Sequence, residues 1–209
     1  MDDKQRHRRL RLLIKSLNKQ RKKQAKKIDI LCNDLIAAQR NFIKRLNTIS
    51  FIANFYESII GTTDLNNLLY TAVKLIKDKN ADPNITFFLR QADNFELHMF
   101  ESCQPTVLEK QHFENCFNPE LMDNICKSNK VCTLDDMFAM GLQGNLIELN
   151  RISAVTIPLA MFGSSLGFML IYRSSDNKLT ADEINNISTV TSGLSRAIVS
   201  CQALSPATD

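Results

Sequence analysis

A heptad repeat of apolar residues runs from Ile14 to Ile59 without a change of register. With Ile14 at position a, the a positions are Ile14, Arg21, Ile28, Leu35, Phe42, Ile49 and Tyr56, and the d positions are Leu17, Gln24, Leu31, Ala38, Arg45, Ile52 and Ile59. No Pro or Gly precedes Gly61. The repeat predicts a helix about 70 Å long, because a helix rises about 1.5 Å per residue. Such a helix cannot be buried in a small domain, so the sequence predicts a coiled coil and a homodimer.

Three polar residues interrupt this seam, namely Arg21, Gln24 and Arg45. A polar residue at a seam position can set the register and orientation of a coiled coil at a cost in stability. It can equally mark a place where the coil frays or bends. Arg45 is closest to the rest of the chain, so we expect it to be the better candidate for a point through which a conformational signal passes.

The charge of the chain is divided unevenly along its length. Residues 1–30 carry twelve Lys and Arg and three Asp, whereas the remainder carries fourteen Lys and Arg and nineteen Asp and Glu. A basic helix of this kind, spanning residues 4–27, fits an anionic partner such as a nucleic acid, an anionic lipid surface or an acidic protein. It is also typical of the solvated exterior of a coiled coil. Because no aromatic residue precedes Phe42, any nucleic-acid contact is expected to involve phosphates alone.

The composition of the 209 residues, 44% of them hydrophobic, leaves room for one globular core in addition to the helix. The longest apolar run, 154–162, is too short for a membrane span and contains a Pro. The N-terminus lacks the apolar core of a secretory signal. Six cysteines without such a signal suggest free thiols in a reducing compartment. The sequence therefore predicts a cytoplasmic protein.

The globular part reads as alternating helices and strands. Residues 65–79 have helical spacing after the capping sequence at 62–64, and strands are expected at 85–90 and 95–101. Helical patterns follow at 107–117, 119–129 and 134–140, with a short strand at 131–133. Two further strands at 153–161 and 166–172 enclose a turn, and the second is apolar enough to be covered on both faces. A capping box at Thr180–Glu183 begins the last helix.

The last helix carries a second heptad-like stripe, formed by Ile184, Ile187, Thr191, Leu194, Ile198 and Cys201. We expect this stripe to take part in dimerisation together with the first seam. The residues expected in the dimer interface are Ile14, Leu17, Ile28, Leu31, Leu35, Phe42, Ile49, Ile52, Ile184, Ile187, Leu194 and Ile198.

The final 50 residues carry a family resemblance. Val155-Thr156-Ile157-Pro158-Leu159, then Gly163, then Leu166-Gly167-Phe168-Met169-Leu170, and then the capping sequence before a long helix, follow the closing hairpin and helix of GAF domains. The resemblance extends over about 62–203, and the preceding helix is similar to the signalling helix that often leads into such domains. It implies an α+β fold with an antiparallel sheet flanked by helices, preceded by a long coiled-coil helix.

The GAF resemblance also implies a domain organisation and a pocket. The domains expected are a basic coiled-coil helix at 1–60, a GAF-like domain at 61–203 and a disordered tail at 204–209. In this family an insertion, here 103–150, folds over a ligand pocket on one side of the sheet. The residues expected to line it are Phe87, His98, Phe100, Leu121, Ile125, Thr156 and Met169. The motifs of the cyclic-nucleotide, bilin and methionine-sulfoxide subtypes are missing, so the resemblance does not identify a ligand or a cofactor.

Four cysteines cluster in the sequence of the insertion: Cys103, Cys116, Cys126 and Cys132, with His98 and His112 nearby. Thiolates and imidazoles bind soft metals, and reactive thiols sense oxidants. The spacing matches no metal knuckle of the Cys-x-x-Cys type, however, and isolated cysteines commonly pack as small hydrophobic residues. The sequence therefore favours core packing over a metal or redox site.

Motifs for catalysis are not found: the sequence has no phosphate-binding glycine loop, nucleophile elbow or metalloprotease signature. We therefore expect a regulatory protein and not an enzyme. The leading hypothesis is a dimeric sensor whose GAF-like domain binds a small ligand or partner and relays the change through the coiled coil to an effector in trans. The alternatives are an adaptor that only dimerises and docks, a binder of nucleic acid or anionic surfaces, and a thiol redox enzyme.

Overall fold

The computed structural model describes residues 3–79, 83–91, 94–100, 116–144, 149 and 151–204. It comprises two compact units, residues 1–50 and residues 51–209. The helix α1, Asp3–Ile59, supplies all of the described part of the first unit and the beginning of the second. None of the described helices is apolar over a stretch long enough to cross a membrane.

The first unit consists of helix with its seam exposed. Seven of its apolar a and d residues are each more than half exposed: Ile14, Leu17, Ile28, Leu31, Leu35, Phe42 and Ile49. Single exposed apolar residues are normal on a protein surface, but a contiguous row of this length is not. The long helix is thus confirmed, whereas its pairing with another helix stays a prediction.

The second unit begins inside α1, earlier than the boundary at residue 61 that the sequence suggests. Phe51, Phe55 and Ile59 are buried in the core of this unit and are four residues apart. Residues with this spacing lie on one face of a helix. The last turns of α1 are therefore part of the globular core.

The described strands form a five-stranded antiparallel sheet in the order β2-β1-β5-β4-β3. Its members are β1 (Asn84–Gln91), β2 (Asn94–Phe100), β3 (Cys132–Thr133), β4 (Ile152–Met161) and β5 (Ser164–Ser174). The β4–β5 pairing contains a register shift at Leu159/Ala160. The strand β5 is buried on both faces along Gly167–Arg173, as its apolar sequence predicts for a central strand.

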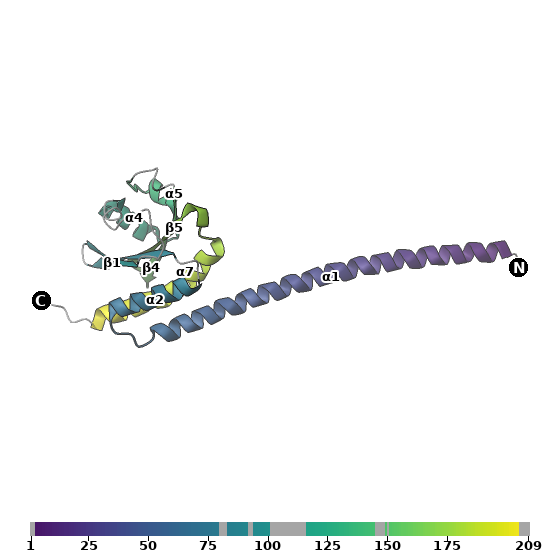
Figure 1. Ribbon diagram of the computed structural model, residues 1–209, viewed down its shortest axis with the longest axis horizontal. Helices are drawn as coiled ribbons and strands as arrows, with labels where there is room; N and C mark the ends of the chain where they lie inside the picture. The colour runs from purple at the N-terminus through teal and green to yellow at the C-terminus, as the bar shows by residue number, and fades with distance from the viewer. Residues whose placement is uncertain are drawn as a thin grey trace. The chain divides into compact units, whose positions relative to one another are not determined.

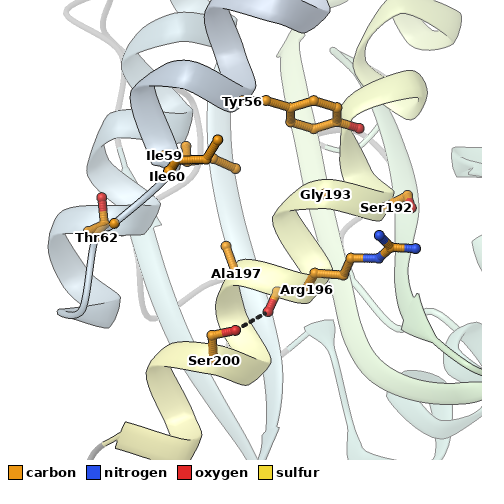
Figure 2. Close-up of a pocket in the computed structure, with 10 residues that line it drawn as sticks. Tyr56, Ile59, Ile60, Thr62, Ser192, Gly193, Arg196, Ala197 and Ser200 are labelled. Carbon is orange, nitrogen blue, oxygen red and sulfur yellow. Dashed lines mark hydrogen bonds between the residues drawn. The ribbon is translucent and has the colours of Figure 1, made fainter.

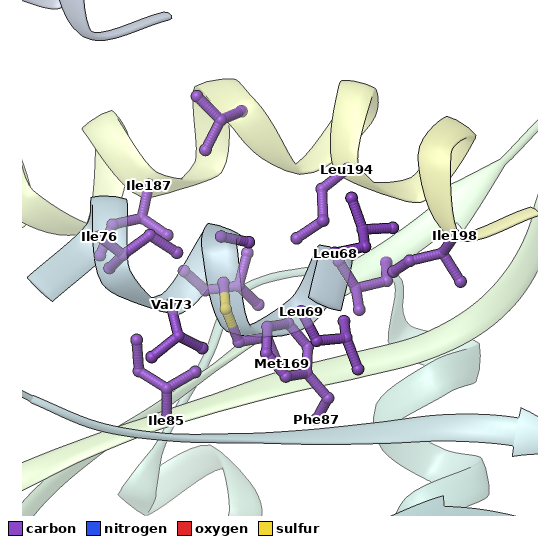
Figure 3. Packing of buried hydrophobic residues seen from close by; sticks show 14 of the residues in the cluster. Leu68, Leu69, Val73, Ile76, Ile85, Phe87, Met169, Ile187, Leu194 and Ile198 are labelled. Atoms are coloured by element: carbon purple, nitrogen blue, oxygen red, sulfur yellow. The ribbon is translucent and has the colours of Figure 1, made fainter. Parts of the chain in front are cut away.

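One face of the sheet is covered by α2 (Leu65–Lys79) and α7 (Ala181–Leu204), and the end of α1 contributes to the same hydrophobic cluster. Figure 1 shows α2 and α7 on this side, and Figure 3 shows side chains of both helices packed together with those of the strands. The sheet contributes alternate residues to this cluster, among them Phe87, Met169 and Ile171. We call this the helix face.

The opposite face, which we call the insertion face, is covered by α4 (Pro119–Ser128) and α5 (Leu134–Ala139) (Figure 1). Asn118 caps α4 by accepting a hydrogen bond from the Leu121 backbone N–H, 2.8 Å from its Oδ1, and Pro119 occupies the first turn as predicted. Thr133 and Asp136 form a capping box on α5 that the sequence analysis did not identify. The predicted helix at 107–117 lies almost wholly outside the described residues.

The capping box at the start of α7 is confirmed and is joined to the sheet by a buried ion pair. The Thr180 N–H donates to Glu183 Oε2 at 2.8 Å, and the Glu183 N–H donates to Thr180 Oγ1 at 3.3 Å. Arg173 of β5, only 6% exposed, donates from NH2 to the same Oε2 at 2.6 Å. Burial alone raises the pKa of Glu183, but the hydrogen bonds from Thr180 and Arg173 and the charge of Arg173 outweigh it and lower that pKa.

Replacing the carboxylate of this pair should destabilise the domain in a pH-dependent way. We expect Glu183→Gln to lower the free energy of unfolding by about 2 kcal/mol at pH 7, because Arg173 keeps a neutral acceptor but loses its counter-charge. A lowered pKa in the folded state contributes stability above the ordinary glutamate pKa and loses it as the pH falls. The difference from wild type should therefore shrink below about pH 4.3. Urea unfolding at pH 7 and pH 3.5 measures both effects.

The exposed Glu57→Gln, which removes one carboxylate elsewhere in the same unit, is the matched control. It should change the free energy of unfolding by no more than about 0.5 kcal/mol at either pH. A Glu183→Gln deficit that stays constant between the two pH values would contradict the role assigned to this ion pair.

Candidate functional site

A groove lies between the last turns of α1 and residues 192–200 of α7, within the globular unit (Figure 2). Its volume is about 450 Å³. The residues that line it are Tyr56, Ile59, Ile60, Gly61, Thr62, Ser192, Gly193, Arg196, Ala197 and Ser200. We call it the interhelical groove.

Small side chains on one face of α7 create the groove. Gly193 and Ala197 are four residues apart, so they lie one turn apart on the same face, and Ser200 follows three residues later. The ring of Tyr56 lies directly against Gly193, because a Cβ placed on this glycine would be 2.1 Å from a ring carbon. A larger residue at 193 would therefore push the end of α1 away from α7.

The polar groups of the groove are largely satisfied within the domain. The Ser200 hydroxyl donates to the Arg196 carbonyl oxygen at 3.0 Å (Figure 2), and the Tyr56 hydroxyl donates to the Thr189 carbonyl oxygen at 3.4 Å. The side chain of Arg196 is exposed on α7, and Ile60, at the end of α1, is 77% exposed. An apolar floor with a polar rim resembles a protein–protein contact more than a small-molecule site.

The insertion face is filled by aromatic rings where the structure describes it. The rings of Phe88 and Phe168 are stacked with centroids 4.7 Å apart, and the Phe117 ring lies 5.0 Å from Phe88. Beside them, Thr156 of β4 is fully buried, and its Oγ1 has no hydrogen-bond partner among the described residues. A buried hydroxyl without a partner costs about 1–3 kcal/mol, so this is where an additional polar group would be stabilised.

At the level of sequence, no family model and no curated protein matches the chain. Many solved structures resemble it in fold. The GAF domain of a phosphoenolpyruvate-protein phosphotransferase from Coxiella burnetii has a TM-score of 0.55 and 14% identity, over 76% of this chain and 96% of that one. The GAF domain/HD domain protein from Geobacter sulfurreducens has a TM-score of 0.51 and 13% identity, over 69% and 98%.

A segment of a methyl-accepting chemotaxis protein, residues 122 to 287, has a TM-score of 0.52 and 18% identity, over 73% of this chain and 99% of that one. The globular unit has the GAF fold. The sequence resemblance is confirmed at the level of the fold, and the closing hairpin and helix that carried it are β4, β5 and α7.

The seven residues expected to line one pocket are divided between the two faces of the sheet. This corrects the sequence-based prediction that all seven face the same side. Leu121, Ile125 and Thr156 lie on the insertion face. The other four lie on the helix face: Phe87, His98, Phe100 and Met169. The Phe100 ring packs edge-on against Phe87 with centroids 6.0 Å apart. Because β1 and β5 are apolar on both faces, their sequences show no alternation from which parity could be read.

The stripe expected to dimerise through the last helix is also corrected. Ile187, Leu194 and Ile198 are fully buried in the core of the GAF domain, and Ile184 is packed against it. In α1, Ile52 is partly buried against the same core. Ile187, Leu194 and Ile198 therefore cannot form an interface between copies while the domain is folded, whereas Ile184 and Ile52 keep part of their surface accessible. The face of α7 that remains accessible is the one with Ser192, Gly193, Arg196 and Ser200. The sequence did not lead us to this face. The four-residue spacing of the small residues Gly193 and Ala197 could have indicated it.

The described cysteines of the insertion are free thiols buried in the hydrophobic cluster of the insertion face. Cys116, Cys126 and Cys132 are each at most 4% exposed, and Cys132 Sγ donates to the Lys130 carbonyl oxygen at 3.4 Å. Burial raises the pKa of the Cys126 thiol, although a hydrogen bond with Ser165 and the charge of Arg90 act in the opposite direction. A raised pKa disfavours the reactive thiolate. Within the described part of the chain no group of His, Cys, Asp and Glu side chains could hold a metal; Cys103 and His112 lie outside it.

Proposed function

We propose that this chain is a dimeric sensory or regulatory protein of the cytoplasm, in which the GAF domain binds a small ligand or partner and relays the change through α1 to an effector in trans. One observation carries the proposal. The last turns of α1 are core residues of the globular domain, whereas the apolar seam of the same helix is exposed from Ile14 to Ile49. A helix of this kind joins the packing of a domain to an association surface.

Dimerisation is supported by the seam. Burying an exposed Leu or Ile side chain contributes about 1.5–3 kcal/mol, and a second copy of α1 is the partner whose a and d residues complement this row. The interhelical groove provides a second apolar surface on the GAF domain itself. Its small residues let another helix approach closely.

The relay is supported by two adjacent rows of residues at the end of α1. Phe51, Phe55 and Ile59 face the core, while the seam positions Ile52 and Tyr56 are only partly buried beside them. If the helix rotated about its axis, residues that now pack in the core would turn toward the seam, and seam residues would turn toward the core. A ligand could drive this change only if it bound one arrangement more tightly than the other.

The ligand step is supported by Thr156, whose buried hydroxyl on the insertion face has no partner among the described residues. The clustered rings of Phe88, Phe117 and Phe168 on the same face favour a second function, an adaptor that dimerises without a ligand. Native mass spectrometry of the purified dimer separates the two. A co-purified small molecule supports sensing, and a dimer of bare chain mass supports the adaptor.

Dimerisation through the seam can be tested at two neighbouring residues. Leu35 occupies an a position and Ile36 the adjacent b position, and both are exposed. We expect Leu35→Asp to raise the dimer dissociation constant by at least about 100-fold, because each copy would bury a carboxylate in the seam. Ile36→Asp, which makes the same change off the seam, should leave the constant within about 3-fold of wild type.

Sedimentation equilibrium between 0.1 and 50 μM measures both constants. A wild-type chain that is monomeric throughout this range would overturn the proposed dimer. Equal effects of the two substitutions would show association through some other surface.

A further inference from the structure

The N-terminal half of α1 carries a row of cations along one face, spaced three or four residues apart. We call it the basic ladder; its members are Lys4, Arg8, Arg11, Lys15, Lys19, Lys22 and Lys26. At about 100° per residue, all seven lie within an arc of about 80°. The row is about 33 Å long, with one cation for each turn of the helix.

The ladder is exposed, and the stretch of α1 that carries it contains no acidic residue. Residues 4–28 contain no Asp or Glu, and every side chain from 4 to 27 is exposed. Three more cations, Arg9, Lys23 and Lys27, lie outside the row, about 80–120° around the helix from its centre. Like charges three or four residues apart destabilise a helix by about 0.2–0.5 kcal/mol per pair. Repulsion between the ladder cations therefore destabilises the isolated helix. Attraction to an anionic partner would make the same cations stabilising.

We propose that the basic ladder binds the phosphate backbone of double-stranded nucleic acid without reading its sequence. A straight row of equally spaced cations complements a linear polyanion, and its length is close to the 34–36 Å of one turn of B-DNA. Phosphate contacts position a protein on a duplex but carry no sequence information.

A membrane surface fits the ladder less well. The apolar stripe that would enter lipid, formed by Leu10, Leu13, Ile14 and Leu17, is centred about 150° around the helix from the ladder. With this stripe in the bilayer, the cations would point toward water. Interfacial helices also use Trp or Phe anchors, and no aromatic residue precedes Phe42. The same absence disfavours single strands, which bind by stacking their bases on aromatic rings.

The test measures binding of the full chain to a fluorescent 30-base-pair DNA duplex of mixed sequence by anisotropy between 50 and 300 mM NaCl. If all seven cations contact phosphates, the slope of log K against log salt should be about −6. The affinity should then fall by more than about 1,000-fold between 50 and 200 mM. A second duplex of unrelated sequence should bind equally well.

Two triple variants separate the ladder from diffuse charge. The first, Lys15→Gln, Lys19→Gln and Lys22→Gln, removes three ladder cations. The control, Arg9→Gln, Lys23→Gln and Lys27→Gln, removes three cations of the same segment that lie outside the row. Gln has nearly the helix propensity of Lys and Arg, and circular dichroism confirms retained helicity. We expect the first to reduce the slope by about 3 and the control by less than about 1.

Three outcomes would overturn the proposal. The two triple variants could lose the same amount of salt slope, the wild-type chain could fail to bind the duplex at 50 mM salt, or it could bind single-stranded DNA of the same length more tightly than the duplex. Phosphatidylserine vesicles and polyglutamate are tested as competitors at matched anion concentration. If the vesicles displace the duplex, the partner is a lipid surface instead, and if polyglutamate displaces it, the partner is an acidic protein.

Discussion

Gly167→Ala is expected to abolish folding of the globular domain, which has the GAF fold. Gly167 lies in β5 with φ +133°, and a Cβ at this position would be 1.9 Å from the Phe88 carbonyl oxygen and 3.0 Å from its carbonyl carbon. It pairs with Leu89 on one side and Leu159 on the other, so neither neighbouring strand can move away without breaking the sheet. We expect a loss of more than about 4–5 kcal/mol, which a small domain rarely survives.

Thermal unfolding followed by circular dichroism, together with the soluble yield, measures this effect. Gly163 is the matched control, because it also has a positive φ, +82°, but a Cβ there would have no neighbour within 4 Å. Gly163→Asn should keep a cooperative transition, since Asn tolerates this backbone conformation. A Gly167→Ala variant that melts within a few degrees of wild type would be incompatible with the strand packing described here.

Phe55→Ala is expected to destabilise the globular domain by about 3–5 kcal/mol, although residue 55 belongs to the long helix. Its side chain has 0% exposure and lies in the core cluster, with the Phe51 ring at 6.0 Å and the Tyr56 ring at 6.2 Å. Truncation removes the buried ring and leaves a cavity that the surrounding sheet and helices fill only in part. The result would show that the end of α1 is part of the domain.

Hydrogen exchange of peptides from β1 and β5 in increasing urea reports the stability of the sheet. Phe42→Ala is the control, because Phe42 lies on the same helix within the other compact unit and is 63% exposed. It should leave exchange in β1 and β5 unchanged to within about 0.5 kcal/mol. If Phe55→Ala had equally little effect, α1 would end before the domain core, and the proposed relay would lose its basis.

The order of elements was predictable because each has a local signal. Hydrophobic spacing marked α2, Pro119 marked the start of α4, and the Thr180–Glu183 capping box marked the start of α7. The turn and glycine of the β4–β5 hairpin supported the GAF resemblance. These features depend on residues close together in the chain, so one sequence suffices to recognise them.

The faces of the central strands were not predictable in the same way. Phe87 and Phe88 are adjacent and both almost completely buried, but they belong to opposite faces of the sheet. An apolar run assigns both residues to the interior and does not say which of them faces α7. The register of β1 with β5 settles the question, and that register is a long-range property.

The sequence by itself determined the long helix, its apolar seam, its basic N-terminal half and the α+β order that resembles a GAF domain. The tertiary structure decided where the helix joins the core and which stripe of α7 stays accessible. The physical reason is that both helices carry apolar residues on more than one face. Periodicity identifies each row, but only the shape of the sheet and the neighbouring helices selects Phe55 and Leu194 for burial and leaves Leu35 exposed.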